Sequence, residues 1–256
     1  MDGREMGRER LDGLIADVSE ISGYFHLYTA DAPGGPWLPL DRLLDDGPGF
    51  AGRVATVAER IGTDESRVAA SVLHLGLAAR LWSPVLGAAV AHRVILDWDA
   101  DVLRWKDVLG GPLPLSLPAP SGSPVAEPVA AAAALYAAVE PLLERLSGLV
   151  LGEVKLAPRL LWGNNASALG GAVRALASAR PSLAADALAL GDALMVTGKL
   201  RGTGDFAEPA PGRVFFTRTT CCLYYRIPGG GKCGDCALLD PATRRAQWAR
   251  ALKETP

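Results

Sequence analysis

The chain has 256 residues, enough for one large domain or two small ones and for a substantial buried core. Apolar residues make up 49% of it and charged residues 21%, which excludes wholesale disorder. The net charge of −2 argues against a general nucleic-acid binder, because such proteins are usually markedly basic.

Helical spacing of apolar residues dominates the first 107 residues, which we expect to form a helical N-terminal region. The expected elements are, in chain order, a helix over 5–20, a strand over the aromatic-rich residues 22–29, helices over 54–61 and 68–79, and a further helix to about Leu96 that Pro84 starts or kinks.

The clearest break in the pattern is the proline-rich stretch 108–128, which predicts a linker or a long surface loop. Residues 129–198 predict a helical central region. In the C-terminal segment, 199–256, a β-rich run over 214–228 precedes a helix with Asp240 as its N-cap. The predicted fold class is therefore mainly α (α+β), with a small C-terminal β element.

No segment predicts a transmembrane helix or a secretory signal. The longest stretch without charge, 108–126, contains five prolines, and the first residues mix acids and bases without an apolar run. We therefore expect a soluble protein in the reducing cytoplasm, where disulfides are rare.

All four cysteines of the chain lie within sixteen residues, in the spacing C-C-x10-C-x2-C: Cys221, Cys222, Cys233 and Cys236. Clustered thiols in a reducing compartment indicate metal binding or redox chemistry. The C-x2-C turn lets two sulfurs converge on one metal, and the glycines at 229–231 allow the chain to fold back toward the first pair.

Spacing alone leaves three interpretations of this cluster open. An iron–sulfur cluster of the [2Fe–2S] type is favoured, because two irons accommodate an adjacent pair whose side chains diverge. Structural zinc prefers pairs spaced C-x2-4-C, which Cys221 and Cys222 do not have. A catalytic dithiol at Cys233 and Cys236 would leave the first pair unexplained.

The stretch from Arg218 to Leu239 resembles the C-terminal [2Fe–2S] motif of the ferric-siderophore reductase (ferric iron reductase FhuF-like) family, whose unusual cysteine pattern it matches in order and spacing. Residues 160–172 are also similar to that family, more weakly. The resemblance implies that Cys221, Cys222, Cys233 and Cys236 hold a [2Fe–2S] cluster in the C-terminal β element. It also implies an enzyme that passes single electrons to Fe(III) bound by a siderophore of the hydroxamate class, and that so releases Fe(II).

Positive charge gathers near the cysteines. Residues 199–256 carry a net charge of +5, whereas the first 198 residues carry −7. Arg218, Arg226 and Lys232 are expected to tune the potential of the cluster or to dock an acidic electron donor such as a ferredoxin or flavodoxin, although solvated surface charge is the alternative. No dinucleotide-binding fingerprint is present, which favours an external donor. Transient contact with the inner face of the membrane would have to come through partners.

Two other classes of function stay open from the sequence: a non-enzymatic binding protein with a four-cysteine zinc site, and an electron-transfer protein with a different acceptor.

Several other residues give weaker signals. The histidines at 26, 74 and 92 have no metal-ligand spacing and are expected to be structural. Trp162, Asn164 and Asn165 could line a substrate pocket, but a helix N-cap at one of the asparagines is favoured. We expect Tyr224 and Tyr225 to face opposite sides, one toward the core and one over the cluster.

Overall fold

The computed structural model describes residues 7–29, 36–108 and 111–254. Its helices are α1 (Arg8–Ser19), α2 (Leu40–Asp45), α3 (Gly47–Ile61), α4 (Ser66–His92), α5 (Ala132–Glu153), α6 (Pro158–Ala179), α7 (Ala184–Met195) and α8 (Pro241–Glu254), with short 3-10 turns η1 (Pro128–Ala131), η2 (Pro181–Leu183), η3 (Gly198–Leu200) and η4 (Tyr224–Arg226). The strands are β1 (Leu38–Pro39), β2 (Val94–Leu96), β3 (Arg104–Trp105), β4 (Leu115–Ser116), β5 (Gly122–Pro124), β6 (Gly204–Ala210) and β7 (Arg213–Arg218). The predicted fold class, mainly α with small β elements, is confirmed.

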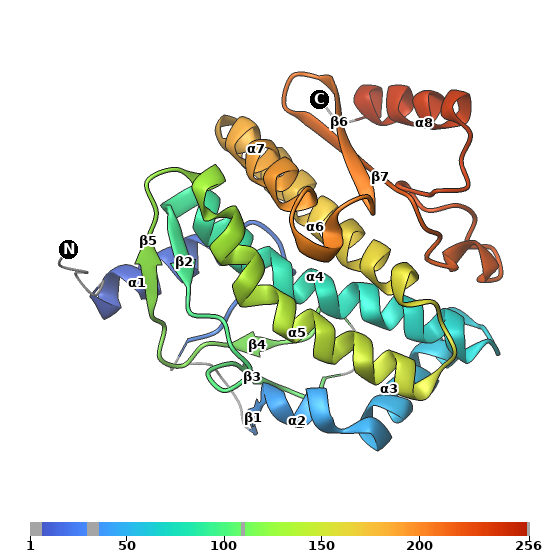
Figure 1. Ribbon diagram of the computed structural model, residues 1–256, viewed down its shortest axis with the longest axis horizontal. Helices are drawn as coiled ribbons and strands as arrows, with labels where there is room; N and C mark the ends of the chain where they lie inside the picture. The colour runs from blue at the N-terminus through green and yellow to red at the C-terminus, as the bar shows by residue number, and fades with distance from the viewer. Residues whose placement is uncertain (1–6, 30–35, 109–110, 255–256) are drawn as a thin grey trace.

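Helix α4 lies at the centre of the helical body, in contact with α1, α3, α5 and α6 (Figure 1). It is apolar on nearly every side, which is why other helices can surround it. Pro84 lies inside this continuous helix, so the alternative of a new helix start there was wrong. Proline removes one helical hydrogen bond, and burial of the neighbouring Trp82, Val85 and Leu86 offsets that loss.

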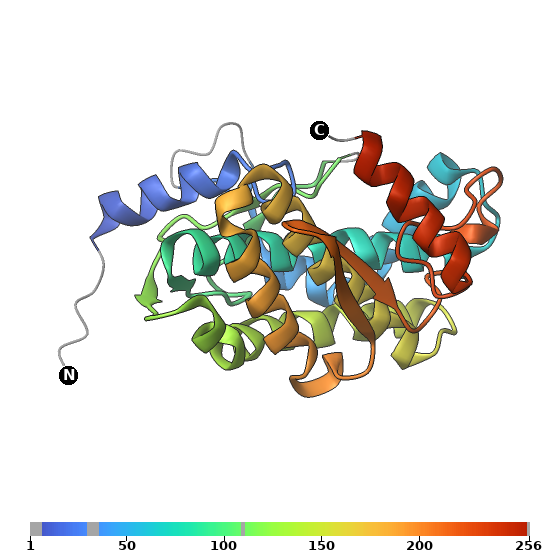
Figure 2. The same cartoon turned by 90° about the horizontal axis from the view of Figure 1, so that it is seen from above.

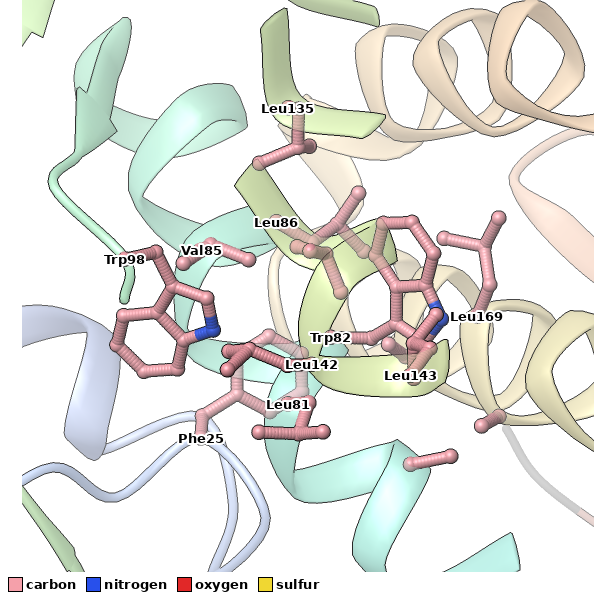
Figure 3. Close-up of a cluster of buried hydrophobic side chains, with 14 of the residues drawn as sticks. Phe25, Leu81, Trp82, Val85, Leu86, Trp98, Leu135, Leu142, Leu143 and Leu169 are labelled. Carbon is pink, nitrogen blue, oxygen red and sulfur yellow. The ribbon is translucent and has the colours of Figure 1, made fainter. Parts of the chain in front are cut away.

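The main core forms where α4 meets α5 and α6. Figure 3 shows Leu81, Trp82, Val85 and Leu86 of α4 beside apolar side chains from α5, from α6 and from two loops: Leu135, Leu142, Leu143, Leu169, Phe25 and Trp98. All ten of these side chains are buried. The burial of this apolar area is the main source of stability for the helical body.

By length and composition α4 also meets the test for a membrane-spanning helix, and it is the one helix of the described residues that does. However, 72% of its apolar window is buried inside the molecule. A core helix surrounded by protein has the same character, so this feature is weak evidence of a membrane span.

The strand predicted over residues 22–29 was wrong: this segment forms turns, with a single bridge from Tyr28 to Ser116. The buried side chain of Arg80 explains the difference. Its guanidinium donates to the backbone carbonyl oxygens of Tyr24, His26 (2.6 Å) and Leu113 (2.6 Å). Because these carbonyls bond to an arginine of α4, the segment does not need a sheet partner to satisfy them.

The proline-rich stretch 108–128, described except for residues 109 and 110, runs against the helical body. Leu113, Leu115 and Leu117 are buried, and β4 and β5 pair with β3 and β2 respectively. The division of the chain into regions at this stretch stays a prediction.

In the C-terminal part, β6 and β7 form an antiparallel hairpin that lies across α6 and α7 (Figures 1 and 2). The expected β run over 214–228 ends at Arg218, and a loop with the turn η4 follows. The predicted start of the last helix is confirmed, since Asp240 Oδ1 accepts hydrogen bonds from the backbone N–H groups of Ala242 (3.0 Å) and Thr243 (2.9 Å).

We expect Leu142→Ala to lower the free energy of unfolding by about 2–5 kcal/mol, because it leaves a cavity among buried side chains of α4 and α5. Leu151→Ala on the same helix is the matched control, since Leu151 is 38% exposed, and it should cost less than about 0.5 kcal/mol. Denaturant unfolding followed by circular dichroism measures both. Equal losses for the two variants would contradict this account of the core.

Candidate iron–sulfur site

The four cysteines lie on the loop that joins β7 to α8, and none is in a disulfide. Cys222 and Cys236 are buried, whereas Cys221 and Cys233 are partly exposed. The Sγ atoms of Cys222 and Cys233 are 3.6 Å apart, so the loop folds back as its glycines predicted. The structure therefore brings the two halves of the motif together from opposite ends of the loop.

Backbone N–H groups point at two of the sulfurs. The N–H of Leu223 donates to Cys221 Sγ (3.3 Å), and the N–H of Leu238 donates to Cys236 Sγ (3.4 Å). Leu223 adopts the left-handed conformation with φ of 68°, which is costly for a residue with a side chain. This strained residue directly follows the Cys-Cys pair, and its N–H bonds to the sulfur of Cys221.

The cysteine side chains shift one another's pKa values. A hydrogen bond from Cys233 lowers the pKa of Cys222 to about 6, and the same interaction raises the pKa of Cys233. Burial raises the pKa of Cys221, and charge on Cys222 or Cys236 raises it further. The contact with Cys233 therefore favours the thiolate form of Cys222, and thiolate is the form that binds metal.

Arg218, at the end of β7, is a buried cation that fastens this loop to the helical body. Its side chain is 1% exposed. Its Nε donates to the carbonyl oxygen of Thr220 (2.5 Å) and its Nη2 to Asn164 Oδ1 of α6 (2.5 Å). Its backbone N–H donates to the carbonyl oxygen of Asp235 in the C-x2-C turn (3.1 Å). One residue therefore holds both halves of the cysteine motif against α6.

Asn164 extends this connection to the central helix. Its Nδ2 donates to the hydroxyl and the carbonyl oxygen of Ser71 on α4, both at 3.0 Å. The Ser71 hydroxyl in turn donates to the carbonyl oxygen of Cys222 (2.8 Å). The favoured role for Asn164 or Asn165 as an N-cap was wrong, because both lie fully buried inside α6. Sequence reasoning missed this role, since a polar residue inside a buried helix was interpreted as a helix start.

Two glycines on α6 allow the loop and β7 to approach closely. A Cβ on Gly163 would collide with Thr220, and a Cβ on Gly170 would lie 2.5 Å from the ring of Phe216. The two positions are seven residues apart and so share one face of the helix. This glycine spacing, inside the stretch 160–172, is the sequence signal that could have located the contact face.

The C-x2-C turn is attached on two more sides. The Ser167 hydroxyl of α6 donates to Asp235 Oδ2. From α8, Arg244 Nη2 donates to the carbonyl oxygens of Cys236 and Leu239, both at 3.1 Å. The turn is therefore positioned by helices that precede and follow it in the chain.

The predicted surface cations lie in different settings. Burial leaves Arg218 no surface to offer a docking partner, so the docking part of its prediction was wrong, while a role in tuning stays a prediction. Arg226 is exposed and pairs with Glu65 at the start of α4 (2.8 Å). Lys232 is exposed and donates to the carbonyl oxygen of Leu238 (3.0 Å).

The other residues that the sequence singled out lie in different settings. Tyr224 and Tyr225 are both exposed on η4, because the chain has left the β conformation there and its side chains no longer alternate. Trp162 is buried near Lys199, which lies 5.6 Å from its ring centre. His74 is fully buried beside Ser147, and burial lowers its pKa to about 3, so it stays neutral.

Comparison with known proteins bears on the same loop. The sequence model of one protein family, the FhuF 2Fe-2S C-terminal domain, matches residues 218–238. No curated protein matches the chain. The family match supports the expected relationship to FhuF-like proteins over this segment and assigns a [2Fe–2S] cluster to it, which favours that interpretation over zinc and over a dithiol.

The residues present fit such a cluster. The loop supplies four free thiols, two N–H groups bonded to sulfur, and a buried cation whose Nη1 has no partner among the described residues. Hydrogen bonds to sulfur and nearby charge are the features that tune [2Fe–2S] clusters. Among the described residues, no group of three or more His, Cys, Asp or Glu side chains is arranged to hold a single metal ion.

We expect Arg218→Gln to lower the reduction potential by about 60 mV, the one-electron equivalent of about 1.4 kcal/mol, because a buried positive charge favours the more negative reduced state. Arg218→Lys keeps the charge and should stay nearer the wild-type potential. Arg226→Gln is the control, because that charge is exposed and paired with Glu65. A spectroelectrochemical titration measures all three potentials. A shift no larger for Arg218→Gln than for Arg226→Gln would contradict the tuning role.

Proposed function

We propose that this protein is a cytoplasmic one-electron reductase of ferric siderophores, with hydroxamates as the siderophore class. The observation that carries the proposal is the match of residues 218–238, with their four free cysteines, to the FhuF 2Fe-2S C-terminal domain. The fastening of this loop to α4 and α6 by Arg218 and Asn164 supports it, since a redox centre needs a rigid frame.

In this proposal Cys221, Cys222, Cys233 and Cys236 hold the cluster, which when bound supplies single-electron transfer. The chain's own residues set the conditions for it. The N–H groups of Leu223 and Leu238 stabilise negative charge on sulfur, and Arg218 supplies a positive charge from the protein side. The Ser71–Asn164–Arg218 hydrogen bonds hold these groups in place.

Chemistry of the metal explains why one electron is enough to release iron. Hard, negatively charged oxygen ligands bind small Fe(III) far better than Fe(II). The ferric ion of the chelate gains one electron and becomes ferrous, while an external donor of the ferredoxin or flavodoxin class loses one. No covalent bond to carbon is formed or broken, and the weakened chelate gives up Fe(II).

The cations at the edge of the loop support docking of an acidic donor. Arg226 and Lys232 are exposed on either side of the glycines 229–231. Arg245 and Arg250 of α8 are exposed as well, and α8 contacts the C-x2-C turn through Arg244. Complementary charge of this kind mainly accelerates association and makes it sensitive to salt.

Replacement of any one of the four cysteines by serine should abolish the visible absorption of the cluster, because each sulfur is a ligand. The variant should also contain less than half of the iron that the wild type binds. Thr219→Ser, an exposed position on the same loop, is the matched control and should keep both. Iron analysis and absorption spectra of anaerobically purified protein provide the measurement. A serine variant that retains the wild-type spectrum and iron content would remove that cysteine from the ligand set.

The double variant Arg226→Gln and Lys232→Gln should slow electron entry from a reduced flavodoxin about tenfold at low ionic strength, and the difference should shrink at high salt. Arg8→Gln with Arg93→Gln changes the net charge equally at exposed positions outside the loop and should have little effect. Stopped-flow reduction kinetics at two salt concentrations compare them. Equal rates for both double variants would contradict docking at this edge.

Trapping of ferrous iron tests the proposed reaction itself. Dithionite-reduced protein, freed of excess dithionite, is mixed anaerobically with a ferric trihydroxamate and a chelator that absorbs only when it binds Fe(II). We expect one Fe(II) trapped for each electron stored in the protein. Reoxidation of the protein without trapped Fe(II) would indicate a different electron acceptor.

A further inference from the structure

A cavity of about 410 Å³ lies against the C-x2-C turn. Its walls come from α4, α6, β7 and the turns at 22–25, and its edge includes Gly234 and Asp235 of the cysteine loop. The volume lies in the range of small-molecule sites, roughly 300–1,000 Å³. Segments far apart in the sequence thus enclose a space that ends between Cys233 and Cys236.

The lining combines apolar walls with few polar groups, as ligand sites do. Phe25, Leu75 and Phe215 provide apolar surface, and the hydroxyl-bearing Tyr24 and Ser83 lie among them. The position of the turns at 22–25 is set by Arg80, whose guanidinium bonds to the carbonyl oxygen of Tyr24. The hydrogen bonds of the buried Arg80 guanidinium therefore hold this wall of the cavity in place.

Arg174 of α6 is the feature that points to a ligand. It lines the cavity, is exposed, and has no hydrogen-bond or ion-pair partner among the described residues. Its Nη1 lies 4.0 Å from the place that a Cβ on Gly234 would occupy, so the guanidinium reaches the C-x2-C turn. Asp235, the other charged residue of the lining, already accepts a hydrogen bond from Ser167.

We propose that this cavity binds the ferric chelate, with Arg174 donating to the negatively charged oxygen atoms that ligate its iron. The proposal rests on the reductase function proposed above and adds the location of its substrate site. A guanidinium recognises anionic oxygen pairs well, and apolar walls accommodate the organic backbone of the chelate.

The position of Arg174 also favours the chemical step. The ferric ion gains one electron, which the external donor loses, and the chelate as a whole becomes more negative by one charge. A cation beside the chelate stabilises the ferrous product state more than the ferric one. Arg174 therefore acts in binding and in electron transfer, and its loss should raise KM and lower kcat together.

Binding can be measured without reduction by using a gallium(III) trihydroxamate, which has the charge of the ferric chelate but accepts no electron. Calorimetric titration of the cluster-loaded protein gives its Kd. We expect Arg174→Gln to weaken this binding about tenfold, the usual value of a charge-assisted hydrogen bond. Gly171→Leu should abolish it, because a Cβ at Gly171 meets no atom within 4 Å and the leucine would fill the cavity.

Matched controls separate the cavity from general effects. Arg159→Gln removes an exposed arginine from the same helix outside the cavity lining, and Gly13→Leu adds a leucine at an exposed glycine of α1 with equally free space. Both should bind the gallium chelate as the wild type does. All four variants should keep the visible absorption of the cluster, which shows that the cysteine loop is intact.

The two proposals fail in different ways. If the wild type releases Fe(II) from the ferric chelate while Arg174→Gln and Gly171→Leu bind the gallium chelate normally, the cavity is not the substrate site and the reductase function stands. If the cluster-loaded wild type neither binds the gallium chelate nor yields Fe(II), the reductase function is wrong and the assignment of the cavity falls with it.

Discussion

The site depends on one buried positive charge. Arg218 ends β7, bonds to Asn164 inside α6 and to the carbonyl oxygen of Thr220 just before the first cysteine, and holds Asp235 between the last two. A charge this deep is tolerated only where hydrogen bonds compensate its lost hydration. The guanidinium is compensated by the carbonyl oxygen of Thr220, beside the first cysteine pair, and by Asn164 of α6. The backbone N–H of Arg218 bonds to Asp235 in the second half of the motif, so this one residue contacts both halves and α6.

Small residues make this assembly possible. Gly163 and Gly170 leave one face of α6 without side chains, so that the loop and β7 can pack against it. Ser71 of α4 is also small, and its hydroxyl donates to the carbonyl oxygen of Cys222. The loop is thereby fixed against the two helices that also build the core. The helical body thus serves as the frame of the redox loop, and the same face of α6 continues into the wall of the cavity at Gly171 and Arg174.

The sequence allowed prediction of what depends on local spacing. Helical periodicity indicated most helices, the Asp240–Pro241 pair located the start of α8, and the cysteine pattern located the redox loop. The features that could not be predicted from the sequence depend on tertiary contacts. Arg218 looked like a surface cation and Asn164 like a helix cap, because their partners lie more than fifty residues away in the chain. The turns at 22–29 looked like a strand because nothing local shows that Arg80 satisfies their carbonyls.

Elemental analysis tests most directly whether the four cysteines hold a [2Fe–2S] cluster. Protein purified without oxygen should contain two irons and two acid-labile sulfides per chain, with zinc far below one equivalent, and be coloured. A colourless protein with one zinc and no labile sulfide would contradict the claim and replace the redox site with a structural one.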